Sequence, residues 1–296
     1  MLPKLAALIF AFALTVSIAR AADIAPARAN LSAAEIVNKN VEARGGLQAW
    51  RAVQTMSMEG RLGVGGNQRT TLSEPLPGKP LAKIPTDLRP KEEVQLPFSI
   101  EVKRPGKQRI ELLFNGKKAL QVFDGVNGWK LRPFLNRIEI EPFTADELKA
   151  ASMQADLDGY LVDYSSKGTR VDLDGTEKVE DHDTYRLKLT LKSGKEVHVW
   201  IDAQTFLEAK IEGLPRKLDG IEHPVEVYYR DYRPVSGLQI PFVLETRVLP
   251  LANPVKGFRD TPVPAERITI QKVLVNPKLD ESSFSKPEIA TASKGH

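Results

Sequence analysis

The stretch Ser99–Pro142, SIEVKRPGKQRIELLFNGKKALQVFDGVNGWKLRPFLNRIEIEP, decides the fold of this chain. Apolar residues alternate with polar ones along it, beginning with Ile100 and Val102. A period of two is typical of antiparallel strands that have one apolar face. Asn115-Gly116 and Asp124-Gly125 interrupt the alternation, and both pairs tolerate the positive φ angles of tight hairpin turns. The stretch therefore predicts a meander of short antiparallel strands.

The same pattern recurs in the rest of the chain and predicts further strands. Thr55–Val64 is expected to be a strand, followed by a turn at 65–67 and a partner strand at 68–73. The segment 74–97 holds six prolines, and 250–264 is a second proline-rich loop. Because proline cannot donate to a central ladder, we expect both to run over the surface or around a rim. Asp174-Gly175 is expected to be a turn, and further strands are expected at 171–173, 185–191, 197–201, 206–211, 225–229, 240–244 and 268–275.

Two capping boxes mark the starts of helices. Ser32-Ala33-Ala34-Glu35 begins the first, and Gly45-Gly46 supplies its left-handed stop. A short helical turn through Leu47–Val53 is expected to follow it. Thr144-Ala145-Asp146-Glu147 begins the second, which is expected to run to about Gly159.

The N-terminal residues predict export. Residues 1–21 contain Lys4, an apolar run from Leu5 to Ile18 and the small-residue end Ala19-Arg20-Ala21, which match a cleavable signal peptide. An uncleaved anchor is the competing interpretation, but about 14 apolar residues are fewer than the roughly 20 that a spanning helix needs. We expect a flexible lead-in at 22–30, one domain at 31–287 and a disordered tail at 288–296.

Composition excludes several classes of protein. The chain has 296 residues and no cysteine, so it has no disulfides, thiol nucleophile or thiolate-bound metal. Its formal charge is +4, and removing Lys4 and Arg20 leaves +2, too little to indicate a nucleic-acid partner without a basic patch. No nucleophile elbow, phosphate loop or dinucleotide fingerprint occurs. We therefore predict no catalytic residues, no metal site and no cofactor; Asp181-His182-Asp183 and the pair His198 and Trp200 are interpreted as surface residues.

The expected sheet is too large for the expected helices to cover. About ten strands of about eight residues, about 4.8 Å apart with a rise of about 3.3 Å per residue, give a face of about 1,200 Å². Two helices of about 11 to 15 residues cover about 400 Å² of this face. The apolar face must then be buried by the sheet packing on itself as a sandwich, or the sheet must curl around a groove that the helices cover. The second arrangement leaves an apolar cavity for a ligand, and both remain open at this point.

Several spaced motifs resemble a known family. They are Val102-Lys103-Arg104-Pro105, Asp124-Gly125, Gly128-Trp129 and Pro133, and the closing Val275–Asp280 followed by Phe284 and Pro287. Together they resemble the outer-membrane lipoprotein-sorting proteins, the LolA-like family, over residues 31–287. The resemblance implies a mainly β fold with α-helices, a curved antiparallel half-barrel whose helices lid a concave apolar face. It also implies a carrier of acyl chains through the periplasm of a Gram-negative cell, in which an arginine at the position of Arg104 holds the lid by hydrogen bonds.

We accordingly expect a periplasmic, non-catalytic carrier or binding protein for lipid or lipoprotein acyl chains. Its partners would be that cargo and envelope donor or acceptor proteins, with peripheral membrane contact only. The alternative is an envelope sensor or scaffold that uses the same fold to bind proteins. Arg104 is expected to hold the lid, and the predicted cavity residues, whose side of the sheet is open by one register, are Val102, Ile110, Leu112, Phe114, Val122 and Trp129.

Overall fold

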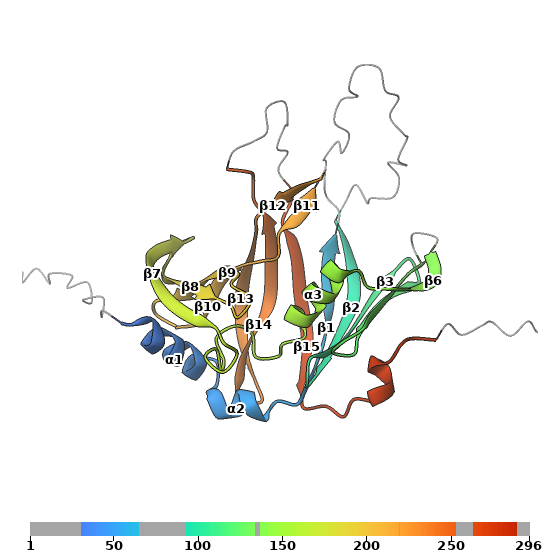
Figure 1. Cartoon of the computed structure of the whole chain (residues 1–296), viewed down its shortest axis with the longest axis horizontal. Coiled ribbons are helices and arrows are strands. Elements are labelled where there is room, and N and C mark those ends of the chain that lie inside the picture. The colour runs from blue at the N-terminus through green and yellow to red at the C-terminus, as the bar shows by residue number, and fades with distance from the viewer. Residues whose placement is uncertain (1–30, 65–92, 134–136, 219, 253–262, 289–296) are drawn as a thin grey trace, which may run out of the picture. The chain divides into compact units, whose positions relative to one another are not determined.

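A computed structural model describes residues 31–64, 93–133, 137–218, 220–252 and 263–288 (Figure 1). The chain divides into Met1–Leu31 and Ser32–His296, and the fold reported below is that of the second unit. The predicted signal peptide, the lead-in, the segment 65–92 with the expected partner strand, most of the second proline-rich loop and the tail from residue 289 lie outside the described residues.

The described part of the chain is mainly strand, with few helices. The helices are α1 (Ala33–Ala43), α2 (Leu47–Ala52), α3 (Ala145–Gln154) and the 3₁₀-helix η3 (Glu281–Phe284). The strands are β1 (Thr55–Val64), β2 (Val94–Lys103), β3 (Lys107–Phe114), β4 (Lys117–Phe123), β5 (Gly128–Arg132), β6 (Arg137–Pro142), β7 (Arg170–Val179), β8 (His182–Thr190), β9 (Glu196–Asp202), β10 (Glu208–Glu212), β11 (Arg216–Leu218), β12 (Ile221–His223), β13 (Val225–Val235), β14 (Leu238–Val248) and β15 (Glu266–Val275).

Thirteen of these strands form one open, curved antiparallel sheet in the order β6-β5-β4-β3-β2-β1-β15-β14-β13-β10-β9-β8-β7 (Figure 1). Strands β11 and β12 form a separate hairpin. The meander β2 to β6 that the sequence predicts is confirmed, since each of its strands pairs with the next. The last strand, β15, closes the centre of the sheet by pairing with β1 and β14. The predicted mainly β half-barrel is therefore the observed fold.

The hairpin turns follow the turn chemistry of the sequence. Asn115 and Gly116 between β3 and β4 have φ angles of 49° and 71°, the signs that a tight two-residue hairpin requires. The carboxylate of Asp124 accepts hydrogen bonds from the backbone N–H groups of Val126 and Asn127 at 2.8 and 2.6 Å. Although burial alone raises it, these bonds keep the pKa of Asp124 below its ordinary value. Both turns are thus specified locally.

Helix α1 begins and ends where its sequence signals lie. Ser32 and Glu35 form the capping box, and the N–H of Gly46 donates to the carbonyl of Val41 at 2.8 Å. Gly45 has a φ of 116°, and a Cβ on it would lie 2.3 Å from the carbonyl oxygen of Gly237. Only glycine therefore allows α1 to end this close to the β13–β14 turn.

Three expectations are wrong. Helix α3 ends at Gln154, short of Gly159, because the Asp156 carboxylate accepts the N–H of Asp158 in a local turn. Asp174-Gly175 lies inside the continuous strand β7, where the β7–β8 register shifts, so it is a bulge instead of a turn. The end of the segment 74–97 was expected to run over the surface, but Pro97 lies within β2, where it pairs with Arg61 of β1 just beyond the end of the β2–β3 ladder.

The pairing register divides the sheet into two faces. We call the face that α1 and α3 lie against the inner face and the other the outer face. Across the inner face, pairs run from β8 to β14, from Leu244 of β14 to Leu96 of β2, and from Met58 of β1 to Lys130 of β5, with a register shift between Glu59 and Gly60 of β1. The β8–β9 end of the inner face is fully buried, with Leu187, Leu189 and Ile201 at 0% exposure. Arg186 and Lys188 alternate with these residues and lie on the outer face.

Candidate functional site

The central strands carry apolar side chains on the inner face that are only partly covered. Met58 pairs with Ile100, which pairs with Ile110, and Leu62 pairs with Ile268, which pairs with Leu244. All of them are half-buried, unlike the fully buried β8–β9 end. We call this set the inner apolar strip, and it comprises Met58, Leu62, Ile100, Ile110, Leu112, Leu244 and Ile268.

Two covers lie against the inner face on either side of this strip. Helix α1 docks at the β8–β10 end, where the Asn40 side chain donates to the carbonyl of Phe206 at 2.8 Å, and Phe206 stacks on Tyr185. Helix α3 docks at the other end, where Ala151 and Ala155 form a small buried cluster with Phe123 of β4. In Figure 1, α3 crosses in front of the central strands, while α1 and α2 lie toward the β7 edge.

The register divides the predicted cavity residues between the two faces. Val102, Ile110, Leu112 and Phe114 alternate along β2 and β3 in phase with the inner face. Val122 and Trp129 pair with each other, and Val122 also pairs with Arg109, so these two lie on the outer face. Leu112, which pairs with Phe98, belongs to the inner apolar strip.

The outer-face residues are packed under the C-terminal segment. Phe284 of η3 is 1% exposed and Val122 is 0% exposed. A surface hollow of about 440 Å³ beside η3 is lined by Trp129 and Phe284, among others. Lys103 and Lys107 both form ion pairs with Glu281, at the start of η3. A second element thus covers β3 and β4 from the side opposite the covers of the inner face.

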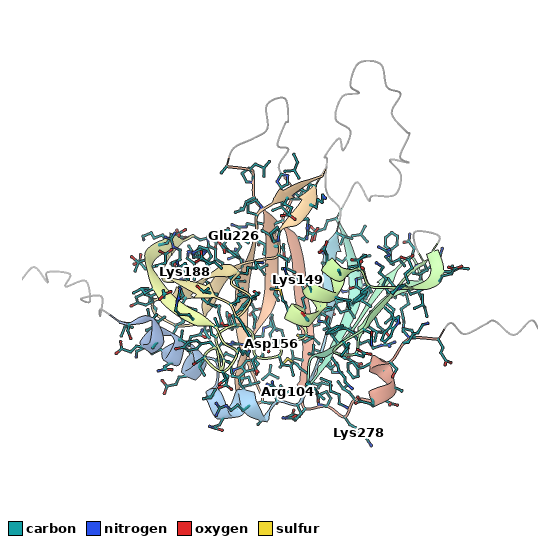
Figure 2. The ribbon with its side chains drawn as sticks, in the orientation of Figure 1. Arg104, Lys149, Asp156, Lys188, Glu226 and Lys278 are labelled. Atoms are coloured by element: carbon teal, nitrogen blue, oxygen red, sulfur yellow. The ribbon has the colours of Figure 1, made fainter. Side chains whose placement is uncertain are left out.

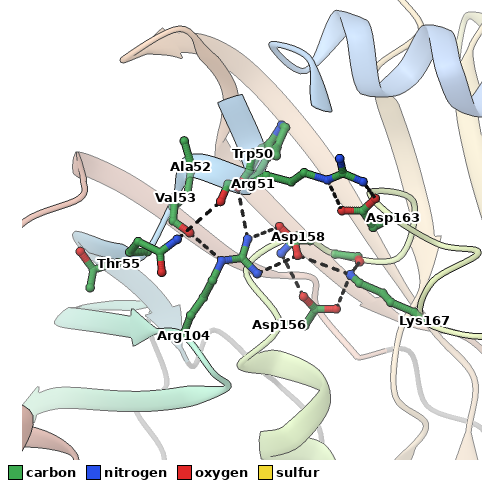
Figure 3. Close-up of polar contacts among 12 residues, drawn as sticks. Trp50, Arg51, Ala52, Val53, Thr55, Arg104, Asp156, Asp158, Asp163 and Lys167 are labelled. Carbon is green, nitrogen blue, oxygen red and sulfur yellow. Dashed lines mark hydrogen bonds and ion pairs between the residues drawn. The ribbon is translucent and has the colours of Figure 1, made fainter. Parts of the chain in front are cut away.

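Arg104 joins the end of β2 to the segment that follows α3. Its guanidinium forks onto the Asp158 carboxylate, with Nη1 2.9 Å from Oδ2 and Nη2 bonded to Oδ1 (Figure 3). Its Nε also donates to the carbonyl of Val53 at 2.6 Å, and Nη2 donates to that of Trp50 at 3.2 Å. The hydrogen bond and charge of Asp158 raise the pKa of Arg104, so it stays cationic. Arg104 is therefore tied to both α2 and the α3–β7 connection.

Arg44, just after α1, reaches the same connection. Its Nη1 donates to the backbone carbonyl of Asp158 at 3.2 Å and lies 3.2 Å from the Glu208 carboxylate. Its guanidinium also stacks over the Trp50 ring at 4.2 Å. The Glu208 backbone carbonyl in turn accepts the hydroxyl of Tyr232 at 3.1 Å. Two arginines from distant parts of the chain thus meet at one residue, Asp158.

A third arginine completes this network. Arg51 of α2 forks onto Asp163 at 2.9 and 2.6 Å, and Lys167 pairs with Asp156 at 2.6 Å (Figure 3). We call α1, α2 and residues 156–168 together the arginine-tied cover. Arg44, Arg51 and Arg104 hold its parts to one another and to the end of β2. Figure 2 shows Arg104 and Asp156 at the end of the sheet where α2 lies.

Helix α3 is held by a separate ion pair. The ammonium of Lys130, on β5, lies 2.6 and 2.5 Å from the two oxygens of Glu147. The Lys130 side chain is 7% exposed. Burial alone raises the pKa of Glu147, but the Lys130 hydrogen bond and the Thr144 backbone N–H lower it overall, so the pair is ionised. Glu147 thus serves both the capping box and the link to the sheet.

Of these polar residues, sequence analysis singled out Arg104 for the lid and Glu147 for a capping box. Asp156 and Asp158 lie in an Asp-x-Asp-Gly pattern that is typical of a turn, and nothing local indicates an arginine partner. Lys130 alternates with Trp129, which was expected to face the cavity, so the pattern placed Lys130 on the other face and only the observed register turns it inward. Arg44 follows a predicted helix end and carries no signal of its own.

The described residues contain no group of three or more acidic or histidine side chains arranged to hold a metal. His198 pairs with Glu212 at 2.9 Å, and His182 pairs with Asp202 at 2.8 Å, both on the outer part of the sheet. No helix in the described ranges combines the length and apolar character needed to cross a bilayer.

Comparison with known proteins identifies the fold. No protein-family model matches the sequence, and no curated protein matches it. Among solved structures, a LolA superfamily protein from Nitrosomonas europaea is similar over 86% of this chain and 98% of its own, with 12% identity and a TM-score of 0.50. A DUF1329 family protein from Desulfovibrio piger is similar over 86% of this chain and 97% of its own, with 14% identity and a TM-score of 0.50. The fold is thus LolA-like, as the sequence motifs predict.

Proposed function

We propose that this chain is an exported carrier or binding protein that holds lipid or lipoprotein acyl chains against its inner apolar strip. It carries out no catalytic step. The observation that supports this most directly lies along one face, where the β8–β9 end is sealed and the central strands keep a set of half-buried apolar side chains beside buried ones such as Phe98 and Ile270. Monomeric proteins rarely leave such a surface without a ligand or partner.

The location and the partners follow from the same proposal. The apolar segment between Leu5 and Ile18 supports export, and the resemblance to the LolA-like family favours the periplasm of a Gram-negative cell as the destination. The LolA-like fold supports acyl chains as cargo, handed over by envelope donor and acceptor proteins. Val102, Ile110, Leu112 and Phe114 are the proposed ligand-contacting residues, and Arg104 is proposed to hold the cover. Val122 and Trp129 would support the sheet from the outer face.

A matched pair of variants tests the proposal. Leu112 lies on the inner face, and its neighbour Leu113, 43% exposed, lies on the outer face. The chain from residue 22 onward is purified, stripped of lipid and titrated with a fluorescent fatty acid. We expect L112Q to weaken binding at least about tenfold and L113Q to leave it within about twofold, since only the first places an amide against the acyl chain.

Mass spectrometry of an organic extract of the purified protein gives an independent measurement. Lipid recovered with the wild type and depleted in L112Q supports the carrier. A delipidated protein that binds no fatty acid, carries no lipid and retains a stable protein partner would instead favour the envelope sensor or scaffold.

A further inference from the structure

The two covers of the inner face are held with very different strength. The arginine-tied cover buries Ile36, Val37 and Val41 of α1 and Trp50 of α2. Its parts are joined through Arg44, Arg51 and Arg104, which reach two aspartates and three backbone carbonyls. Opening it means breaking a connected network of charged hydrogen bonds along with a well-filled apolar contact.

Helix α3 has much less to hold it. Ala151 is its buried residue, and the cluster that it joins is completed by Phe123 and Ala155, with Phe143 and Leu148 partly buried around it. Among the described residues, the ion pair that links the helix itself to the sheet is that of Lys130 and Glu147, beside the bond from the Phe143 N–H to the Gly128 carbonyl just before it. Because an alanine buries little apolar area, this helix depends on the ion pair more than the other cover does.

Helix α3 lies next to the inner apolar strip, so a movement of α3 away from the sheet would expose the surface beside the strip. Gly128, at the start of β5, has no side chain, and a Cβ there would lie 1.9 Å from the Phe143 ring, so the segment entering α3 lies directly on the inner face. Phe123 is in phase with Gln121, which pairs with Ile110 of the inner apolar strip. When α3 lifts, it uncovers the sheet next to that strip.

We propose that α3 is the gate through which cargo reaches the inner apolar strip, and that Lys130 and Glu147 form its latch, while the arginine-tied cover stays closed. The gate rests on the proposed carrier function, but its latch is tested without cargo. Breaking the pair leaves an ammonium that is 7% exposed without its counter-charge, which favours the lifted helix, where water can reach it.

Hydrogen exchange followed by mass spectrometry measures the latch directly. E147Q keeps an oxygen for the capping box and removes the charge that Lys130 requires. Asp146→Asn is the matched control, since Asp146 is exposed, lies in the same first turn and loses the same charge. We expect E147Q to raise amide exchange in 145–154 about tenfold, D146N to raise it less than twofold, and neither to change 33–53 or 156–168. Equal effects of the two variants would overturn the latch.

Because the chain has no cysteine, each cover can be crosslinked in its closed position through a pair of introduced cysteines. A short bismaleimide across K130C/E147C fastens α3 to β5, and the same reagent across R51C/D163C fastens α2 to 156–168. With the fluorescent fatty acid, we expect the first crosslink to slow uptake at least about tenfold and the second to leave it within about twofold. The reverse pattern would show that cargo enters under the arginine-tied cover and would overturn the gate.

The two proposals fail separately. If no variant binds the fatty acid, the wild type included, the carrier function fails and the gate fails with it, while the exchange measurement still decides whether the latch exists. If the wild type binds and E147Q exchanges like D146N, the carrier function stands and the gate is refuted.

Discussion

The bond between Arg104 and Asp158 is the interaction in this protein whose energy can be predicted most closely. The carboxylate of Asp158 is 9% exposed and receives two guanidinium hydrogen bonds, and the guanidinium is 28% exposed. A hydrogen bond to a charged group contributes about 1.5 to 3 kcal/mol, and a forked pair lies toward the upper end. R104M also removes the donors to two backbone carbonyls, so we expect it to lower the free energy of unfolding by about 2 to 4 kcal/mol.

A double-mutant cycle isolates the pair itself. The free energy of unfolding is measured by urea titration at pH 7, followed by circular dichroism, for the wild type, R104M, D158N and the double variant. We expect a coupling energy of about 1.5 to 3 kcal/mol. R51M is the control, because Arg51 also forks onto an aspartate of the same segment but its side chain is 49% exposed. It should cost clearly less than R104M, because an exposed ion pair contributes little to stability.

Two results would refute this reasoning. A coupling energy below about 0.5 kcal/mol would mean that Arg104 and Asp158 act independently. Equal costs for R104M and R51M would mean that burial at Asp158 contributes nothing, and the arginine-tied cover would then have no preferred anchor.

Three further predictions concern other parts of the sheet. Arg230 and Arg247 lower the pKa of Glu180 from 4.5 to about 2, so the stabilisation of the fold by these ion pairs is complete above about pH 4.5 and is lost as the pH falls toward 2. In urea titrations, E180Q should lower the free energy of unfolding by about 0.5 to 1 kcal/mol at pH 7 and leave it unchanged near pH 2. A difference that persists at pH 2 would contradict this. F284A should lower the free energy of unfolding by about 3 to 5 kcal/mol in the same measurement. V126A, at a site 77% exposed, should change it by no more than about 0.5 kcal/mol, and similar costs for the two variants would show that η3 is not part of the core. Both Gly45 and Gly46 have positive φ, but only at the first would a Cβ meet a backbone oxygen, so G45A should lower the thermal midpoint more than G46A.

The elements that were predicted correctly have local causes. The start and stop of α1 depend on a capping box and a glycine pair within a few residues of the helix. The β2–β6 meander depends on alternation and on turns such as Asn115-Gly116. The misjudged end of α3 has a local cause as well, since the Asp156 side chain competes with the helix for a backbone N–H.

The candidate site divides in the same way. Leu112 and Leu113 are adjacent leucines, and the alternation alone places them on opposite faces without saying which face is inner. The face is chosen by what packs on it, here α3 on one side and η3 on the other. Val122 and Trp129 were grouped with the inner residues because their pattern is equally apolar, and only the register separates them.

The sequence by itself determined the β3–β6 meander, where α1 and α3 begin, and that Arg104 stands at the end of a strand. Those features depend on interactions within a few residues, which a linear pattern records. The tertiary structure alone decided that Asp158, 54 positions away, receives Arg104, that Lys130 meets Glu147, and which apolar side chains stay half-buried. Such outcomes depend on how far the sheet curves and on where the covers come to rest, because burial and pairing energies arise only when distant groups exclude water from one another.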